Sequence, residues 1–258
     1  MNRIQQLFRE KEGGILSIYI TAGYPEKEDT VPIIRALQDH GADMVEVGIP
    51  FSDPLADGRV IQQSSQEALA GGMSLKLLFE QLKEIREQIT IPLVLMGYLN
   101  PILRMGMVNF LSRCRETGID GVIIPDLPPG EYESLYRDQF AKYGILHSLL
   151  ITPQTSPERI GYIAGLTDGF LYMVADAATT GKRDAISDSQ RAYFSRIRKM
   201  DLPVPALIGF GISTHETFTV ACRYARGAII GSAFIRMLGE EGSSQESIGR
   251  FLRQIRQG

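Results

Sequence analysis

Short apolar runs rich in β-branched residues alternate with amphipathic stretches along the whole chain. Apolar runs of this length, bounded by turn residues, are typical of buried strands, and the periodicity between them is typical of helices. Ser74, for example, precedes a stretch in which Leu75, Leu78, Leu82 and Ile85 share one helical face. The predicted strands are Leu16–Thr21, Met44–Ile49, Pro92–Met96, Gly121–Pro125, Leu146–Ile151, Phe170–Val174, Ala206–Gly209 and Ala228–Gly231.

Strands that are apolar throughout belong in parallel sheets covered on both sides. Strand–helix units repeated along 258 residues, as here, predict an α/β fold, a (β/α)8 TIM barrel, formed by a single domain over residues 1–258. A helix expected over Asn2–Glu10 precedes the first strand and would cover the bottom of the barrel. An open doubly wound sheet is the alternative, but no Gly-x-Gly-x-x-Gly follows the first strand, which favours the barrel.

Composition narrows the setting in which the chain works. A formal net charge of −3 gives no reason to expect a nucleic-acid partner. The two cysteines, Cys114 and Cys222, have no metal-ligand spacing and suggest a reducing compartment. No apolar run of about 18 residues is present, and the N-terminus lacks the apolar core of a signal peptide. We therefore expect a cytoplasmic protein that does not enter a membrane.

Glu46 is the most informative residue, because it is a carboxylate inside the apolar run Met44–Ile49. An isolated buried charge is costly, so burial should raise its pKa. Asp57 follows in a turn-rich loop, and a strand carboxylate with a loop carboxylate nearby favours proton-transfer chemistry. The alternatives are a structural Glu46 paired with an arginine inside the barrel and an ordinary Asp-Gly turn at Asp57.

Other unusual residues collect where predicted strands end, which is where barrel enzymes place their active sites. Tyr98 follows the third strand, Asp126 follows the fourth, and Tyr172 lies on the sixth. Asp126 could equally cap a loop, and a tyrosine at a position like that of Tyr172 is more often a core residue than a catalytic one.

The glycines after the last two strands predict a phosphate site. Gly211 leads into a helix start at Ser213, and Gly231 is followed by Ser232. Glycine lets backbone N–H groups approach an anion, and helix N-termini supply further donors. Gly181, in the loop after the sixth strand, could close over the anion. Alternatively, these glycines only make tight turns.

Absent residue patterns narrow the chemistry. No lysine lies on a predicted strand, as a Schiff-base aldolase would need, and the three histidines are scattered rather than clustered as metal ligands. No metal site is expected. What remains is acid–base chemistry on a phosphorylated small molecule without a cofactor.

The segment Val45–Gly58, which reads Val-Glu-Val-Gly-Ile-Pro-Phe-Ser-Asp-Pro-Leu-Ala-Asp-Gly, resembles the tryptophan synthase α-subunit family. The segments Gly209–Ser213 and Gly231–Ala233 match the phosphate loops of that family in the same order, and the resemblance covers essentially the whole chain. It implies the cofactor-free retro-aldol cleavage of indole-3-glycerol phosphate to indole and glyceraldehyde 3-phosphate.

The resemblance also implies roles for individual residues. Glu46 would be the general acid and base, Asp57 would accept a hydrogen bond from the indole N–H and remain ionised, and Tyr172 would lie beside them. The implied substrate-binding residues are Tyr19, Ile61, Met96, Tyr98, Asp126 and Thr180. The implied phosphate-binding residues are Gly181, Phe210, Gly211, Gly231 and Ser232.

A pyridoxal-phosphate β subunit would be the partner, in an α2β2 heterotetramer, and would hold that cofactor itself. The implied contacts are Pro50, Asp53 and Pro54, with the loops after the third and sixth strands. The chain departs from the family at Ala175–Gly181, where Asp176 stands in place of an arginine. Two other functions are the alternatives: an isomerase acting on a related phosphorylated intermediate, and a non-catalytic subunit that only activates the β partner.

Overall fold

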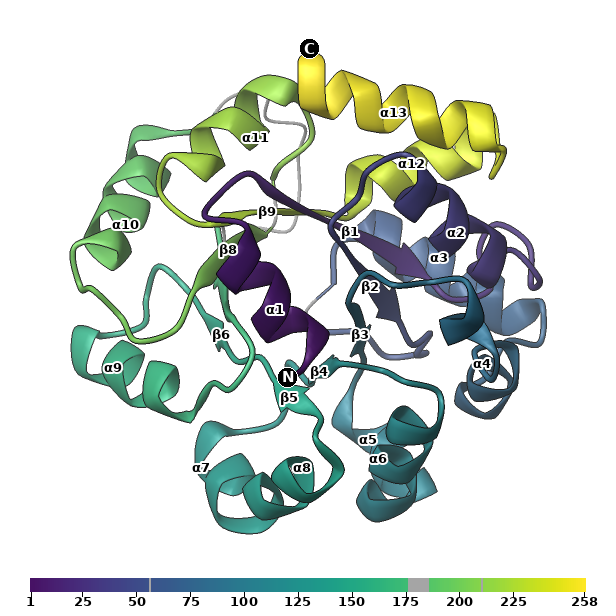
Figure 1. Cartoon of the computed structure of the whole chain (residues 1–258), viewed down its shortest axis with the longest axis horizontal. Coiled ribbons are helices and arrows are strands. Elements are labelled where there is room, and N and C mark those ends of the chain that lie inside the picture. Colours follow the sequence, from purple (N-terminus) through teal and green to yellow (C-terminus); the bar gives the residue numbers. More distant parts are fainter. Residues whose placement is uncertain (56, 176–185, 210) are drawn as a thin grey trace.

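A computed structural model describes residues 1–55, 57–175, 186–209 and 211–258. Its strands form one parallel sheet in the order β5-β4-β3-β2-β1-β9-β8-β7-β6, which curls into the ring seen end-on in Figure 1. The strands are β1 (Ile15–Thr21), β2 (Met44–Gly48), β3 (Leu93–Met96), β4 (Gly121–Ile123), β5 (Leu146–His147), β6 (Leu150–Ile151), β7 (Leu171–Val174), β8 (Ala206–Gly209) and β9 (Gly227–Ile230). The predicted (β/α)8 barrel is confirmed.

The fifth strand differs from its prediction. The run Leu146–Ile151 forms two short strands, β5 and β6, instead of one. Ser148 lies in the break, where its N–H donates to Val122 O at 3.1 Å and its hydroxyl accepts from Phe170 N at 3.1 Å. This side chain replaces a ladder partner, so the barrel closes although the strand is interrupted.

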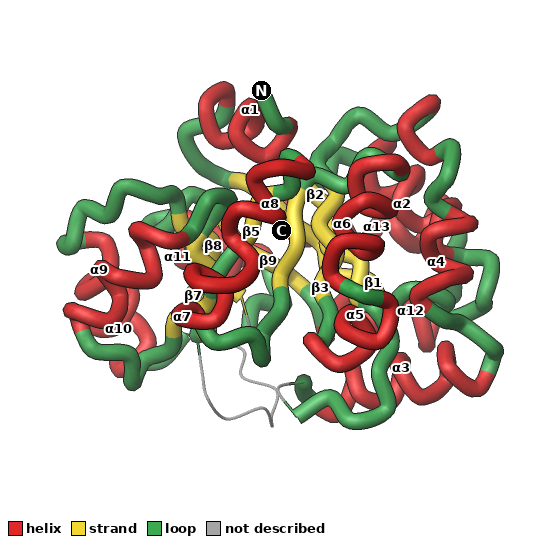
Figure 2. The backbone as a smooth tube through the Cα atoms, turned by 90° about the horizontal axis from the view of Figure 1, so that it is seen from below, coloured by secondary structure: helices red, strands yellow, loops and turns green. Residues whose placement is uncertain are grey.

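Helices surround the sheet, as Figure 2 shows from the side. Their bounds are α1 (Arg3–Glu10), α2 (Thr30–Asp39), α3 (Arg59–Ala70), α4 (Leu75–Gln81), η1 (Ile85–Glu87), α5 (Leu99–Met105), α6 (Met107–Glu116), α7 (Pro129–Glu131), η2 (Tyr132–Tyr136), α8 (Arg137–Tyr143), α9 (Pro157–Leu166), α10 (Asp188–Arg198), α11 (His215–Cys222), α12 (Ser232–Glu241) and α13 (Gln245–Gln257). Among the described residues, none of these helices is long and apolar enough to cross a membrane.

Alternation along the strands divides the core into two clusters. Leu16, Ile18 and Ile20 of β1 pack outward with the helices, whereas Ile15 and Tyr19 belong to the cluster that fills the barrel. The inner cluster also contains Ile4 and Phe8 of α1. Helix α1 therefore covers one end of the barrel, as predicted, and lies across the ring in Figure 1.

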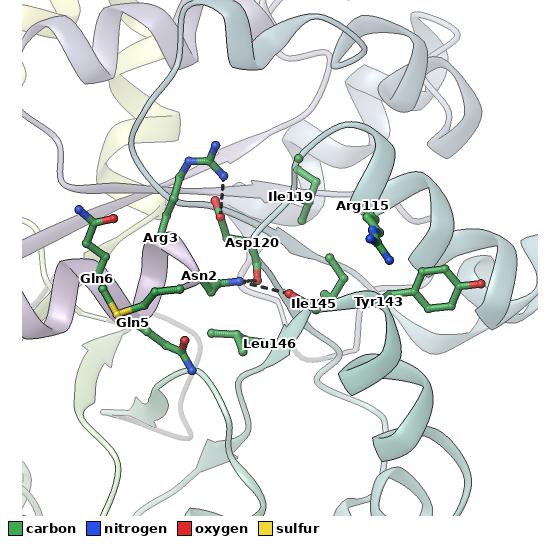
Figure 3. A pocket seen from close by; sticks show the side chains of 13 residues that line it. Asn2, Arg3, Gln5, Gln6, Arg115, Ile119, Asp120, Tyr143, Ile145 and Leu146 are labelled. Carbon is green, nitrogen blue, oxygen red and sulfur yellow. Dashed lines mark hydrogen bonds and ion pairs between the residues drawn. The ribbon is translucent and has the colours of Figure 1, made fainter.

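Asp120, just before β4, fastens this covered end. It is 4% exposed, and its carboxylate pairs with Arg3 of α1 at 3.1 Å and with Arg86 at 2.5 Å, while accepting from Leu93 N at 2.9 Å. Asp120 lines a cavity of about 620 Å³ that α1 shares with the segments before β4 and β5. Figure 3 shows the side chains around it. Asn2 donates to Asp120 O and Gly144 O there. Asp120, Arg3, Arg86 and Asn2 are thus bonded to partners at this end, which serves stability.

Replacing Asp120 with alanine should lower the free energy of unfolding by about 3 kcal/mol, because Arg86 loses its buried counter-ion. Glu116→Ala is the matched control, since Glu116 forms an exposed pair with Arg113 and should cost less than about 0.5 kcal/mol. Urea denaturation would measure both. Equal losses in the two variants would contradict the role given to Asp120.

Candidate active site

Strand β2 carries Glu46 into the barrel interior. Its side chain is fully buried, and Ser17 Oγ of β1 donates to Glu46 Oε1 at 3.0 Å. The second oxygen, Oε2, has no hydrogen-bond partner among the described residues. No described arginine pairs with Glu46, so the structural ion pair considered from sequence is not what holds it. Burial raises the pKa of Glu46 to about 8, and the Ser17 hydrogen bond opposes that rise.

Two tyrosines lie near Glu46, and each passes over a glycine. A Cβ added to Gly48 would lie 2.0 Å from the Tyr19 hydroxyl, and one added to Gly209 would lie 2.3 Å from the Tyr172 hydroxyl. Only glycine at the ends of β2 and β8 gives these rings room. Burial raises the pKa of Tyr172, and the charges of Glu46 and Asp57 raise it further, so the three side chains share one electrostatic environment.

Asp57 lies in the loop between β2 and α3 and is partly buried. The hydroxyl of Tyr98, at the end of β3, donates to Asp57 Oδ2 at 3.1 Å. Phe51 supports the Tyr98 ring, with 5.2 Å between centroids. Burial raises the pKa of Asp57 to about 6, and the Tyr98 hydrogen bond opposes the rise. At neutral pH Asp57 is therefore mostly ionised while Glu46 is mostly neutral.

The predicted apolar walls of the substrate pocket are nearly closed to solvent. Ile61 on α3 and Met96 on β3 are each 8% exposed. Met96 belongs to the inner cluster together with Tyr172, and Tyr19 packs against the same cluster. It therefore lies in the interior that contains Glu46.

Asp126 has a structural contact. Its Oδ1 accepts from Leu99 N, the first residue of α5, at 2.8 Å. The side chain thus caps a neighbouring helix, in line with the alternative considered from sequence. No contact in the structure brings it to Glu46 or Asp57.

The two segments predicted to bind phosphate differ in whether their backbone N–H groups are already hydrogen-bonded to a side chain. At the start of α11, Thr217 Oγ1 accepts from Ser213 N at 3.1 Å and Thr214 N at 3.0 Å, so these donors are used. At the start of α12, Gly231 is the N-cap, and no side chain caps the following N–H groups. Gly211 has φ +77°, a conformation that favours glycine.

Three residues predicted to bind substrate or phosphate, Thr180, Gly181 and Phe210, lie outside the described residues, as does Asp176 in the divergent loop.

The three residues predicted to contact a partner differ in their exposure to solvent. Pro50 and Pro54 are buried within the chain, and Asp53 is exposed. Leu55 in the same loop is 95% exposed, and Leu103 on α5 is 48% exposed. Exposed apolar side chains at the open end of the barrel are candidates for a partner surface. These two leucines are not among the contacts predicted from the sequence.

Ser17, which donates a hydrogen bond to Glu46, is also not among the residues predicted from the sequence. The available signal was a hydroxyl inside the apolar run Leu16–Thr21, two positions before Tyr19, on the face of β1 that points into the barrel.

A (β/α)8 barrel with Glu46 in its interior and Asp57 in a loop after β2 has the arrangement of the barrel enzymes, whose sites lie at this end of the strands. A family model described as "Tryptophan synthase alpha chain" matches residues 4–256, and the chain belongs to this family. A relative from Bacteroides thetaiotaomicron with that name is 54% identical over 96% of this chain and 97% of its own.

Solved structures of tryptophan synthase chains are similar to this chain as well. The tryptophan synthase alpha chain of Legionella pneumophila has a TM-score of 0.89 and 34% identity over 100% of this chain and 97% of its own. A chain of the tryptophan synthase complex from Pyrococcus furiosus has a TM-score of 0.86 and 34% identity, over 94% of this chain and 98% of its own.

The raised pKa of Glu46 predicts a pH-dependent stability. Between pH 4.5 and about 8 the folded chain keeps a proton that the unfolded chain releases. This stabilisation is therefore fully present below pH 4.5 and lost as the pH rises through about 8. Glu46→Gln does not titrate, so its stability relative to wild type should rise by a few kcal/mol between about pH 5 and about pH 9.

Urea denaturation at the two pH values checks this expectation. Glu116→Gln, the same change at an exposed position, should show a nearly constant difference from wild type. A constant difference for Glu46→Gln as well would show that Glu46 titrates normally in the folded chain.

Proposed function

We propose that Glu46 and Asp57 carry the reaction of the tryptophan synthase α family in this chain. The chain is a lyase of tryptophan biosynthesis, and the reaction of its family is the retro-aldol cleavage of indole-3-glycerol phosphate to indole and glyceraldehyde 3-phosphate. The observation that carries the residue assignment is the difference in burial: Glu46 is fully buried with Oε2 unpartnered among the described residues, whereas Asp57 is only partly buried in a loop. Burial accordingly raises the pKa of Glu46 to about 8 and the pKa of Asp57 only to about 6. Two carboxyl groups whose pKa values differ can act as acid and as anion at the same pH.

The steps follow from this difference between the two carboxyl groups. Neutral Glu46 donates its proton to C3 of the indole ring, which gains positive charge. Asp57 accepts a hydrogen bond from the indole N–H and stabilises that charge. Glu46, now a carboxylate, removes the proton of the hydroxyl group on the carbon attached to the ring. The carbon–carbon bond breaks, its electron pair returns to the ring, and an aldehyde forms. Glu46 ends protonated, ready for another cycle.

We assign the substrate phosphate chiefly to the start of α12. Ser232, Ala233 and Phe234 open this helix behind Gly231 without a side-chain cap, so their N–H groups are available to an anion. Gly231 also packs close to Tyr19, with 3.4 Å between the position of an added Cβ and Tyr19 Cβ. The helix start therefore adjoins the pocket walls. Gly211 would add a backbone donor from the preceding loop.

We further propose a β subunit as the partner, in an α2β2 assembly, with pyridoxal phosphate held by that subunit. The name of the family and the Pyrococcus furiosus complex support a partner. The exposed residues Asp53, Leu55 and Leu103 supply charge and apolar area at the open end of the barrel. An apolar residue that is 95% exposed, as Leu55 is, gains from being covered.

Glu46→Gln should reduce indole release from indole-3-glycerol phosphate by at least about 1000-fold, because both proton transfers lose their carrier. Indole would be measured with the purified chain alone and with a tryptophan synthase β subunit. Stimulation of the β reaction should persist and serves as the control for folding. Turnover near that of wild type would refute the assignment. A wild-type chain that releases no indole but stimulates the β subunit would indicate a regulatory subunit.

The dependence of kcat/KM on pH should be bell-shaped. Activity falls below about 6, where Asp57 becomes protonated, and above about 8, where Glu46 loses its proton. Asp57→Asn should remove the acidic limb and keep the alkaline one. An acidic limb that survives in this variant would belong to another group.

Leu55→Glu should weaken binding of the β subunit by about tenfold or more, because it places a charge in a surface proposed to be covered. Gln5→Glu is the matched control, since Gln5 is exposed on α1 at the opposite end of the barrel. Titration calorimetry would measure both affinities. Equal affinities for the two variants would exclude Leu55 from the interface.

A further inference from the structure

Ser17 is a buried hydroxyl in the apolar interior of the barrel. It is 0% exposed, and its register partners are Met44 on β2 and Ile229 on β9, both members of the inner apolar cluster. A hydroxyl left unpaired in such a place costs about 1–3 kcal/mol. Its bond to Glu46 Oε1, at 3.0 Å, meets that need.

The strand register sets the direction from which this bond comes. In the pairing of β1 with β2, Glu46 is the partner of Tyr19, and Ser17 is the partner of Met44. Ser17 is thus two residues nearer than Tyr19 to the end of the barrel that α1 covers. Ser17 therefore holds Oε1 from the closed side of the barrel. The other oxygen, Oε2, is left without a hydrogen-bond partner among the described residues.

We propose that Ser17 is a positioning residue that reserves Oε1 of Glu46 as an acceptor, so that Oε2 exchanges the proton with the substrate. The proposal rests on the assignment of Glu46 as acid and base, and adds which oxygen reacts and what orients it.

The chemistry follows from the two bonding states of the carboxyl group. While Glu46 is neutral, Oε1 accepts the Ser17 hydrogen bond as a carbonyl oxygen, and the proton is on Oε2. When Oε2 has given its proton to the indole carbon, the same bond becomes charge-assisted and stronger. Oε2 then takes the hydroxyl proton back. Ser17 thereby stabilises the charged intermediate state without touching the substrate.

Ser17→Ala and Ser17→Thr test the proposal in the full chain with its β subunit. The alanine variant should lower kcat by about tenfold, with KM changed less than about twofold. Because the hydrogen bond favours the carboxylate, its loss should move the alkaline limb of the kcat profile upward by about one pH unit. The threonine variant retains a hydroxyl, so its kcat and the position of its alkaline limb should stay close to those of wild type.

A purely structural Ser17 would give a different pattern. If Ser17→Ala lowers the melting temperature but leaves kcat and the alkaline limb unchanged, while Glu46→Gln is inactive, the positioning role is overturned and the role of Glu46 stands. If Glu46→Gln itself keeps near wild-type turnover, the acid–base assignment is wrong and the role of Ser17 falls with it.

Discussion

Burial of the Glu46 carboxyl group inside the barrel is the constraint on which the rest of the site depends. A carboxylate surrounded by apolar side chains is costly, and burial therefore holds Glu46 as the neutral acid at neutral pH. Ser17 supplies one hydrogen bond, which keeps the group ionisable, and Gly48 and Gly209 make room for the tyrosines around it. The interior of this barrel is thus a packed core that also contains a buried carboxyl group.

The two ends of the barrel differ in how far their polar groups are paired. At the end covered by α1, Asp120 and its two arginines satisfy one another, and stability is the result. At the opposite end, Oε2 of Glu46 and the N–H groups at the start of α12 are left for a ligand by the described residues. A site that binds and reacts needs such unsatisfied groups, and the ion pairs around Asp120 add stability at the other end of the barrel.

Local patterns revealed much of this arrangement. Apolar runs predicted the strands because a parallel sheet covered on both sides tolerates little else, and Glu46 was conspicuous because it interrupts such a run. Ser17 was not, because a serine in a strand is ordinary until the β1–β2 register places it beside a carboxyl group. The cap that Asp126 gives to α5 depends on the distance between two loops. The break between β5 and β6 depends on the Ser148 hydroxyl replacing a ladder bond. Sequence periodicity contains none of these distances.

A titration of the Glu46 side chain by 13C NMR in the full chain, with the resonance assigned by its loss in Glu46→Gln, tests most directly whether burial keeps this carboxyl group neutral. We expect a midpoint near 8, with the carboxyl group neutral at neutral pH. A midpoint near 4.5, the ordinary value for glutamate, would mean that Glu46 is ionised before substrate binds and could not donate the first proton.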